Sequence, residues 1–334
     1  MGFSLVFLPP QTDVFRSWAE RLRAEVAGLD VTVAETEAEA DAAIAEADGA
    51  VGTVRKERLA HAQKLRWLQS HQAAPPAGYY YPELAQHPLV VTNMREIFND
   101  HIGAHVMAYV LAFARGMHLY LPRQLHSEWK PEALDTAVMH LPECTMLVVG
   151  LGGIGTECAR LAKAFGMTVL ATDARRTDTP ACVDEMHPAS ALDDLLPRAD
   201  FVVLTVPHTP ATEGFFNRAR FQRMKKTAVF INIGRGMTTR LDDLVAALRA
   251  GEIAGAALDV FEIEPLPKNH ALWTMPNVLI TPHTAGYGPY LDERRYEIKS
   301  EDDEGDWRDL INLCKVLSTT PLDQLESALR PILD

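Results

Sequence analysis

The feature that most constrains this 334-residue chain is the stretch from Thr145 to Asp173, TMLVVGLGGIGTECARLAKAFGMTVLATD. Met146 to Val149 form a short apolar run, typical of a buried parallel strand, and the pattern G-x-G-x-x-G follows at once. In such a turn the first glycine permits a tight bend, the second lets a pyrophosphate approach, and the third lets helix and strand pack closely. The free N–H groups and the dipole of the next helix favour an anion, so the turn is a predicted phosphate site.

A helix from Ile154 to Phe165 and a strand from Thr168 to Ala171 are predicted after the turn. The strand leads to Asp173, 18 residues after Gly155 and near the separation of about 20 at which an acid meets ribose hydroxyls. An ordinary glycine-rich turn is the alternative, but strand, helix, second strand and acid stand in register and favour dinucleotide binding. The residues predicted to hold the cofactor are Gly150, Gly152, Gly153, Ile154, Gly155 and Asp173.

The residue type at position 173 predicts NAD as the cofactor. A carboxylate accepts hydrogen bonds from the ribose hydroxyls and repels a 2′-phosphate held against it. Arg175 and Arg176 follow immediately and could instead clamp a phosphate, so NADP stays open.

Composition excludes several classes of protein. A hydrophobic content of 47% in 334 residues suggests two domains with cores of their own, and a net charge of -13 argues against nucleic acid as a partner. No apolar run approaches the roughly 20 residues that span a membrane, and the start MGFSLVFLPP lacks the marks of a signal peptide, so we expect a cytoplasmic protein. The cysteines suggest neither a metal site nor disulfides; they are Cys144, Cys158, Cys182 and Cys314.

Apolar and amphipathic segments alternate along both halves of the chain, which predicts parallel α/β sheets. In the first hundred residues the segments are 5–8, 14–26, 31–33, 38–47, 50–54, 65–68 and 90–91. One long helix is predicted from Asp100 to Leu121, followed by a proline-containing segment, 122–142. After Asp173 the alternation resumes, with helices predicted at 189–196 and 241–250 and strands at 201–205, 228–231, 254–258 and 278–280.

Three polar residues stand in loops at the ends of the later strands, where doubly wound sheets bind ligands. Arg235 lies in NIGRG, Glu264 in ALDVFEIEPLP and His283 in LITPHTAG. Singly each is explained as a structural or surface residue. Together they supply a planar fork for a carboxylate, a proton carrier that titrates near neutral pH, and an acid to orient it. Oxidation of an alcohol by hydride transfer needs that set.

These motifs resemble the D-2-hydroxyacid dehydrogenase family over most of residues 45 to 296. The resemblance rests on NIGRG, on DVF followed by Glu264-Pro265, and on TPH-x-AG, in that order after GLGGIG. It implies that Arg235 binds the substrate carboxylate and carbonyl, that His283 exchanges the proton, and that Glu264 supports His283. It also implies that Asp259 lies near the nicotinamide amide. Further residues expected in the cofactor cleft are Pro207, Thr212, Ile233 and Gly234.

The family's split architecture is a second implication. A flavodoxin-like substrate domain, residues 1–98 and 291–334, is expected around an inserted Rossmann cofactor domain, residues 99–290. Such enzymes are typically dimers through the cofactor domain, so a homodimer is expected. Beyond Ile298 the resemblance fades, and KSEDDEGDWRD stands where a continuous amphipathic helix is expected.

The loop from Ser70 to Tyr81 is predicted to set substrate choice. In the resembling enzymes its backbone N–H groups hold the substrate carboxylate, which implies that Ala73 and Ala74 bind substrate here. Pro75 and Pro76 have no N–H, so the loop has fewer donors. His71, Gln72 and the tyrosines 79–81 are candidate replacements, with a rigid, proline-braced surface loop as the alternative.

The function predicted is NAD-dependent reduction of a small 2-oxoacid, reversible to oxidation of the D-2-hydroxyacid. Two other functions stay open. Phosphite dehydrogenases share the fold, whereas formate dehydrogenases of this kind carry Gln at the position of Glu264. A non-catalytic, dinucleotide-sensing scaffold of the co-repressor kind is the other, and absence of turnover would favour it.

Overall fold

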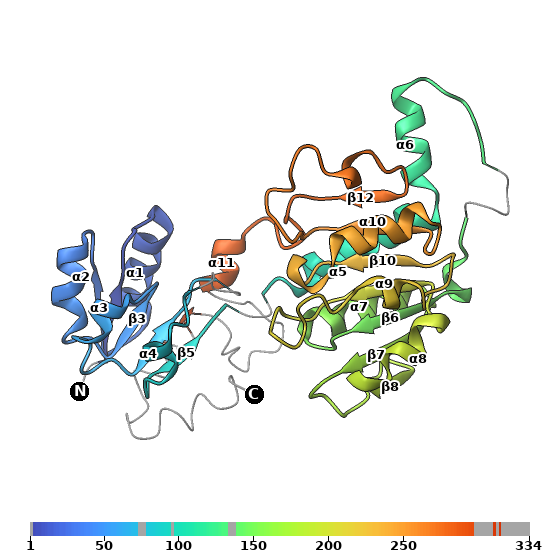
Figure 1. The fold of residues 1–334 in the computed structure, drawn as a ribbon. Coiled ribbons are helices and arrows are strands. Elements are labelled where there is room, and N and C mark those ends of the chain that lie inside the picture. Colours follow the sequence, from blue (N-terminus) through green and yellow to red (C-terminus); the bar gives the residue numbers. More distant parts are fainter. Residues whose placement is uncertain are drawn as a thin grey trace. The chain divides into compact units, whose positions relative to one another are not determined.

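The structure, a computed structural model, describes residues 3–72, 78–94, 97–132 and 138–296, together with Leu310, Ile311 and Cys314. The chain divides into two compact units: unit 1 is residues 1–97 with 288–334, and unit 2 is residues 98–287. Each unit contains a parallel sheet of its own with helices packed on it (Figure 1). The predicted fold class, two doubly wound parallel α/β sheets, is confirmed.

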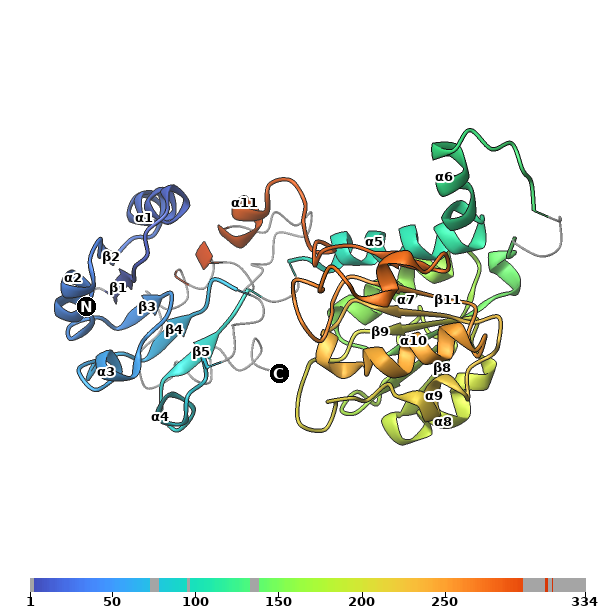
Figure 2. The ribbon, with the colours of Figure 1, turned by 45° about the horizontal axis from the view of Figure 1, so that its top comes forward.

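The described residues of unit 1 contain five parallel strands in the order β2-β1-β3-β4-β5, which is the flavodoxin-like order (Figure 2). The strands are β1 (Phe3–Phe7), β2 (Leu29–Val33), β3 (Gly49–Val51), β4 (Trp67–Gln69) and β5 (Val90–Thr92). The helices are α1 (Asp13–Glu25), α2 (Glu37–Ile44), α3 (Lys56–Leu59), α4 (Pro82–Ala85) and α11 (Leu291–Tyr296).

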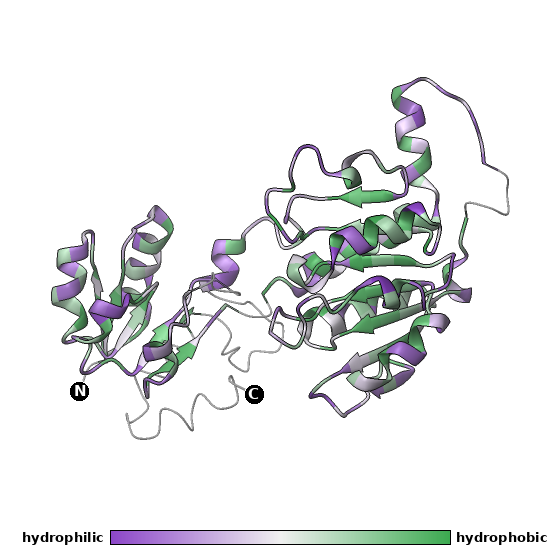
Figure 3. Cartoon of the chain, viewed as in Figure 1, coloured by the Kyte–Doolittle hydropathy of each residue, from purple (hydrophilic) through white to green (hydrophobic). Residues whose placement is uncertain are grey.

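Helix α1 shows how the sequence builds this unit. Thr12 caps it by accepting a hydrogen bond from the backbone N–H of Phe15, at 3.1 Å. The apolar stripe that includes Trp18 and Leu22 is buried, while the opposite face is charged, and α1 carries both hydrophobic and hydrophilic residues along its length (Figure 3). The guanidinium of Arg21 lies 3.7 Å from the ring centroid of Tyr296, which fixes α11 against α1.

In unit 2 the part of the chain that the structure describes forms seven parallel strands in the order β12-β11-β10-β9-β6-β7-β8. The strands are β6 (Thr145–Val149), β7 (Thr168–Asp173), β8 (Glu185–Pro188), β9 (Phe201–Leu204), β10 (Val229–Asn232), β11 (Gly255–Leu258) and β12 (Val278–Ile280). The helices are α5 (Asn99–Ala114), α6 (Met117–Leu125), α7 (Gly153–Ala164), α8 (Leu192–Leu195), α9 (Arg218–Phe221) and α10 (Leu241–Arg249). Short 3-10 turns complete the unit: Leu141–Glu143, Ala189–Ala191, Leu196–Arg198, Gly236–Thr238 and Ala271–Thr274.

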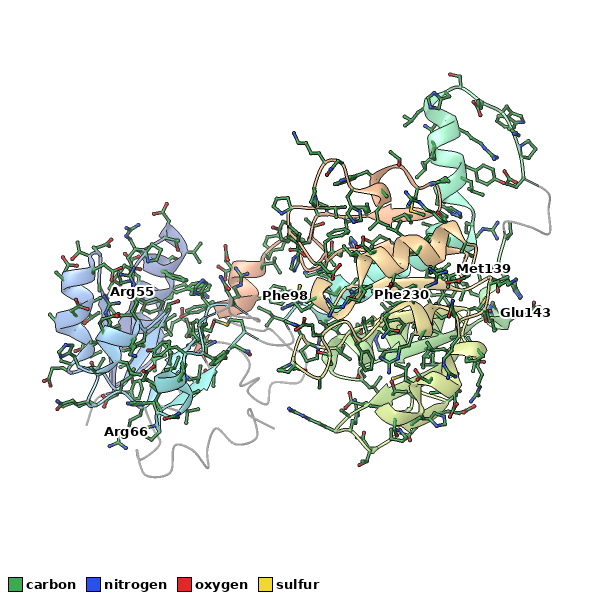
Figure 4. The ribbon with its side chains drawn as sticks, in the orientation of Figure 1. Arg55, Arg66, Phe98, Met139, Glu143 and Phe230 are labelled. Carbon is green, nitrogen blue, oxygen red and sulfur yellow. The ribbon has the colours of Figure 1, made fainter. Side chains whose placement is uncertain are left out.

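The central strands of unit 2 are buried on both faces, as the continuous apolar runs predict. Phe230 of β10, labelled in Figure 4, is fully buried and packs against the rings of Phe216 and Phe221 on one face. Val229 and Ile231 alternate with it and belong to the core on the other face. The sheet therefore has a hydrophobic core on each face, and its polar side chains lie at the strand ends.

The prediction of one helix from Asp100 to Leu121 is wrong. Helix α5 ends at Ala114, Gly116 has a left-handed conformation with φ of 66°, and α6 then begins at Met117. Glycine adopts this conformation without the steric cost that other residues meet, so it interrupts the helix despite the apolar sequence. The segment predicted to follow at 122–142 also begins too early, because α6 continues through Pro122 to Leu125.

The sequence analysis did not predict several short helices and one edge strand. The predicted helix at 189–196 is one turn of α-helix between two 3-10 turns, and β8, α3, α4 and α9 had no prediction. The tail after residue 298 lies almost wholly outside the described residues. Among the helices that the structure describes, none combines the length and apolar character needed to cross a membrane.

Candidate active site

The glycine turn connects β6 to α7. Gly150 has φ of 97°, and a Cβ on Gly155 would lie 2.1 Å from the carbonyl oxygen of Gly150, so neither position accepts another residue without strain. Gly153 packs on the side chain of Asn99, 2.5 Å from where its Cβ would stand. At Gly152, in contrast, a Cβ would meet nothing within 4 Å. Backbone conformation and packing within the protein therefore account for Gly150, Gly153 and Gly155, whereas the space beside Gly152 is open.

Asp173 ends β7 beside this turn. Its Oδ2 accepts the backbone N–H of Leu151 at 2.8 Å, and its Oδ1 accepts those of Arg175 at 2.8 Å and Arg176 at 3.0 Å. Burial acts to raise the pKa of the Asp173 carboxyl, but these N–H groups and the charge of Arg176 outweigh it and lower the pKa. The group is therefore an ionised acceptor. A carboxylate has about four acceptor sites, so one is left for a ligand hydroxyl.

The side chains of the two arginines after Asp173 differ in the hydrogen bonds and ion pairs that they make. The guanidinium of Arg176 pairs with Asp178, Nη2 to Oδ2 at 2.8 Å, and donates to the hydroxyl of Thr156 at 3.0 Å. Arg175 is exposed, and its side chain makes no hydrogen bond or ion pair with the residues that the structure describes. The charge of the Arg176 guanidinium is thus balanced by Asp178, whereas the Arg175 side chain extends into solvent with no acidic partner among the described residues.

The loop after β9 lies against the glycine turn that connects β6 to α7. Thr205 donates its hydroxyl to the carbonyl of Gly150 at 2.5 Å, which ties the end of β9 to the glycine turn. Thr212 folds the loop on itself by donating to the carbonyl of Pro207 at 2.6 Å and accepting the N–H of Thr209 at 2.8 Å. The structure therefore places Pro207 and Thr212 in one compact loop at the strand end next to the turn.

Arg235 follows β10 in a loop that Asn232 organises. The side chain of Asn232 accepts the N–H of Gly234 at 3.0 Å and donates to the carbonyl of Arg235 at 3.2 Å. A Cβ on Gly234 would lie 2.7 Å from the carbonyl oxygen of Val206, so only glycine lets the two loops approach. Ile233, just before, is buried.

The Arg235 side chain is held in a low-dielectric environment. Its Nη1 donates to the Gly234 carbonyl at 2.6 Å. Burial lowers the pKa of the Arg235 guanidinium, and the nearby carboxylate of Glu264 acts in the opposite direction. The result is a partly desolvated cation, the state in which arginine binds a carboxylate most strongly.

His283 and Glu264 form a pair. His283 Nδ1 lies 2.7 Å from Glu264 Oε2, while Glu264 Oε1 accepts the N–H of Phe261 at 2.9 Å. Because a carboxylate only accepts, Nδ1 is the donor, and Nε2 is the nitrogen left to exchange a proton. No group in the described part of the chain bonds to Nε2. Both oxygens of Glu264 are engaged, so the orientation of the ring is fixed.

Asp259 holds the loop that carries His283. The carboxylate is buried and accepts the hydroxyl of Thr281 at 2.5 Å and the N–H groups of Thr284 at 2.8 Å and Ala285 at 2.9 Å. His283, at φ of 55°, donates its own N–H to the Asp259 carbonyl at 2.9 Å. Asp259 was predicted to lie near the nicotinamide, and its contacts make it the anchor of the loop that carries His283.

Sequence reasoning missed the support behind this anchor. His105 and Tyr109, one turn apart on α5, both reach the Thr281 hydroxyl, His105 through Nε2 at 3.0 Å. The Tyr109 hydroxyl also lies 3.2 Å from the carbonyl oxygen of Leu258. Burial lowers the pKa of His105, with Asp259 opposing, so this imidazole is neutral at neutral pH. Two polar residues spaced i, i+4 on an apolar helix are the signal that could have found them.

Ala73 and Ala74, predicted to bind substrate, lie outside the described residues. Within unit 1 the described part of the same loop is held firmly. Tyr79 donates its hydroxyl to the Gly52 carbonyl at 3.0 Å, and Tyr81 donates to the Val54 carbonyl at 3.0 Å. For these two tyrosines the contacts favour the alternative that they brace the loop.

Comparison with known proteins gives the family. The model of the D-isomer specific 2-hydroxyacid dehydrogenase NAD binding domain matches residues 107–285, which cover every candidate residue of unit 2 except His105. The chain belongs to this family. It is 35% identical over 273 residues to the glyoxylate/hydroxypyruvate reductase B of Klebsiella pneumoniae (strain 342), covering 79% of this chain and 82% of that protein. The family's enzymes are oxidoreductases, and this member has an NAD(P)-binding domain.

Solved structures of the family agree in fold. The D-isomer specific 2-hydroxyacid dehydrogenase of Xanthobacter autotrophicus Py2, in complex with NADPH and MES, has a TM-score of 0.76 at 26% identity and covers 98% of this chain and 96% of its own. The NADPH-dependent glyoxylate/hydroxypyruvate reductase of Sinorhizobium meliloti, in complex with NADP and sulfate, has a TM-score of 0.70 at 27% identity and covers 87% and 90%. Family membership therefore leaves the choice between NAD and NADP to the residues of this chain.

Proposed function

We propose that the protein is an NAD(H)-dependent oxidoreductase that interconverts a small 2-oxoacid, of the glyoxylate or hydroxypyruvate kind, and its D-2-hydroxyacid. The observation that carries the proposal is the His283–Glu264 pair, with Nδ1 at 2.7 Å from Oε2, in the same unit as the desolvated Arg235. The reductase relatives support the substrate class. Unit 2 is proposed as the cofactor domain and unit 1 as the substrate domain, with Ala73 and Ala74 in its carboxylate loop.

The roles of the three residues follow from their chemistry. Arg235 pairs with the substrate carboxylate and offsets the negative charge that grows on the carbonyl oxygen during reduction. His283 gives the proton on Nε2 to that oxygen and recovers it from solvent. Glu264 holds the ring and stabilises its protonated form. The bound cofactor supplies the hydride.

The residues at the end of β6 and β7 fit a dinucleotide. The open space at Gly152 and the N-terminus of α7 suit a pyrophosphate, and the remaining acceptor site of Asp173 suits a ribose hydroxyl. Pro207, Thr212, Ile233, Gly234 and Asp259 are proposed to line the rest of the cleft.

We propose NAD rather than NADP because Asp173 is ionised and Arg176 is already paired with Asp178. The NADP-bound relatives favour the other cofactor, and the exposed Arg175 is the residue that would recruit its phosphate. The test compares kcat/KM for NADH and NADPH in the wild type, in Asp173→Ser and in Arg175→Ala. Wild-type preference for NADH, relaxed by Asp173→Ser, is expected. A wild-type preference for NADPH that Arg175→Ala removes would contradict the proposal.

A homodimer through unit 2 is proposed from its surface. Helix α6 has no buried residue among those described, and its apolar side chains Leu121 and Leu125 are 50% and 84% exposed, followed by Trp129 at 98%. Apolar groups so exposed on one segment are typical of an interface. Light scattering after size-exclusion chromatography should give a dimer, and Leu125→Asp with Trp129→Asp should give a monomer. A wild-type monomer would refute the proposal.

The activity is tested by NADH oxidation with glyoxylate, hydroxypyruvate, pyruvate and bulkier 2-oxoacids, and by chiral analysis of the product. Turnover of at least one 2-oxoacid to the D-enantiomer is expected. Phosphite is assayed in the opposite direction with NAD. Turnover of phosphite alone would replace the proposed reaction, and bound NADH without any turnover would favour the scaffold function. The cytoplasmic location stays a prediction.

A further inference from the structure

Three side chains of unit 2 hydrogen-bond to one atom, Oγ1 of Thr281. Asp259 follows β11, and His105 and Tyr109 lie one turn apart on α5. Asp259 and Tyr109 are buried, with 1% and 5% of their surface exposed, and His105 is half-buried. A buried cluster of polar groups is costly unless every member is satisfied, so each of these hydrogen bonds matters.

The proton count fixes the direction of each hydrogen bond in this cluster. A carboxylate only accepts, so the hydroxyl proton of Thr281 goes to Oδ1 of Asp259, at 2.5 Å. Tyr109 and His105 must then donate to the Thr281 oxygen, Tyr109 through its hydroxyl and His105 through Nε2 at 3.0 Å. A hydroxyl has one proton and two acceptor sites, so the hydrogen-bonding capacity of Thr281 is fully used.

Burial keeps both donors of α5 in the protonation state that this arrangement needs. It raises the pKa of the Tyr109 hydroxyl and lowers the pKa of the His105 imidazole, on which the charge of Asp259 acts in the opposite direction. Tyr109 therefore keeps its proton, and neutral His105 carries its single N–H on Nε2. The two rings pack edge to face, with centroids 4.7 Å apart, which restrains the direction of both hydrogen bonds.

These hydrogen bonds end at the loop that carries His283. Oδ1 of Asp259 also accepts the N–H of Thr284 at 2.8 Å, and Oδ2 accepts that of Ala285 at 2.9 Å. His283 itself has φ of 55°, which is uncommon for residues other than glycine, so the surrounding hydrogen bonds must hold it there. Glu264 orients the ring of His283, whereas the backbone fixes the position from which the ring extends.

We propose that His105 and Tyr109 are positioning residues for His283. By donating to Thr281, they direct its hydroxyl to Asp259 and so hold the loop in the geometry that proton exchange requires. Their effect on turnover rests on the proposed function, whereas the restraint of the loop does not.

Replacement of the shared hydroxyl is the direct test. Thr281→Val should lower kcat by about 10- to 100-fold, because displacement of a catalytic group by about 1 Å has an effect of that size, and Thr281→Ser should restore most of it. The pH profile and the KM for the 2-oxoacid should stay as in the wild type, since Glu264 and Arg235 are unchanged. Thr274→Val, at an exposed threonine of unit 2, is the matched control and should change nothing. Wild-type kcat in Thr281→Val, a change confined to KM, or equal loss in Thr281→Ser would overturn the proposal.

The donors on α5 are tested one at a time and then in combination. Tyr109→Phe and His105→Leu should each lower kcat by about 3- to 10-fold, as expected for one neutral hydrogen bond, while His105→Gln keeps an N–H donor and should stay close to the wild type. In the Thr281→Val background Tyr109→Phe should have no further effect, because the oxygen that it binds is gone. Tyr120→Phe, at a tyrosine of α6, is the control. Losses that multiply in the double variant would show independent structural effects and refute the assignment.

Amide hydrogen exchange, followed residue by residue by NMR, reads the loop without any turnover. The N–H groups of Thr284 and Ala285 should exchange faster in Tyr109→Phe, and faster by about tenfold or more in Thr281→Val, while the amides of β10 stay unchanged. Wild-type exchange of both amides in both variants would refute the restraint of the loop. Should the wild type reduce no 2-oxoacid, the proposed function fails, and the exchange rates still decide whether α5 holds this loop.

Discussion

The two sheets of this protein are both doubly wound, with different strand orders, and they present different first loops at the point where the order reverses. In unit 2 the reversal lies between β6 and β9, and the loop is a glycine turn that leads at once into α7. In unit 1 it lies between β1 and β3, and the loop is Leu8-Pro9-Pro10, with α1 beginning only at Asp13. The strand order therefore reverses once in each sheet, and the residues of the loop at that point decide which groups it offers to a ligand.

The backbone explains the difference. At the glycine turn the chain can bend at φ of 97° and offers N–H groups beside an open position, Gly152, which suits phosphate oxygens. Pro9 and Pro10 have no N–H, and the hydroxyl of Thr12 already accepts the N–H of Phe15. The loop at residues 8–12 therefore offers fewer main-chain donors to a phosphate than the glycine turn does. Four predictions test this contrast, in order of decreasing effect.

The first asks whether the chemistry belongs to unit 2. His283→Ala should lower kcat by about 100-fold or more, because a positioned acid is lost, and should leave the Kd for NADH nearly unchanged. His140→Ala is the matched control, since His140 also pairs with a glutamate, Glu143, at 3.4 Å. Glu143 precedes β6, at the end of the strand away from the glycine turn (Figure 4). Equal loss in both variants would mean that the effect is structural.

The second asks whether Gly152 is reserved for ligand. Gly152→Ala should weaken NADH by about tenfold with little change in Tm, because its Cβ meets no protein atom. Gly155→Ala should lower the free energy of unfolding by about 1 to 3 kcal/mol, since its Cβ would overlap the Gly150 carbonyl. Pro9→Ala, at the corresponding loop of unit 1, should leave NADH affinity unchanged. Weakened NADH binding in Pro9→Ala would contradict the prediction that only the glycine turn of unit 2 binds the cofactor.

The third concerns the carboxylate beside His283. Glu264→Gln keeps the shape of the pair but removes the negative charge beside the ring, so the pH profile of reductase activity should move toward lower pH. The measurement is the pH profile of kcat/KM, with Glu143→Gln as the control. If the two profiles match that of the wild type, Glu264 does not govern the proton transfer.

The fourth and smallest effect is acid sensitivity. Burial lowers the pKa of His71 in unit 1 and of His105 and His118 in unit 2 below the ordinary value of 6.5. Below that pH the unfolded chain binds protons that the folded rings do not, so the free energy of unfolding should fall as pH drops from about 7 to 5. Hydrogen exchange of the two sheets should show the larger loss in unit 2. His105→Gln and His118→Phe should reduce it; an unchanged loss would contradict the assignment.

The described structure confirms the alternation of strands and helices, because buried parallel strands are near-continuous apolar runs and the glycine turn has a fixed spacing. The local sequence pattern could not predict that Gly116 separates α5 from α6, because the apolar residues on both sides of this glycine favour one continuous helix. The short β8 likewise has no apolar pattern, because it is an edge strand of partly exposed residues. The roles of Arg235, Glu264 and His283 stay predictions.

By itself the sequence determined what each loop can offer: glycines where a backbone must be approached, an acid at position 173, and an arginine, a glutamate and a histidine at three strand ends. The tertiary structure decided which of these meet. The 2.7 Å contact of His283 with Glu264 spans 19 residues, and Tyr109 reaches Thr281 across 172. Parallel strands bring their carboxyl ends to one edge of the sheet, so residues far apart in sequence become neighbours there, and only the fold can specify which pairs those are.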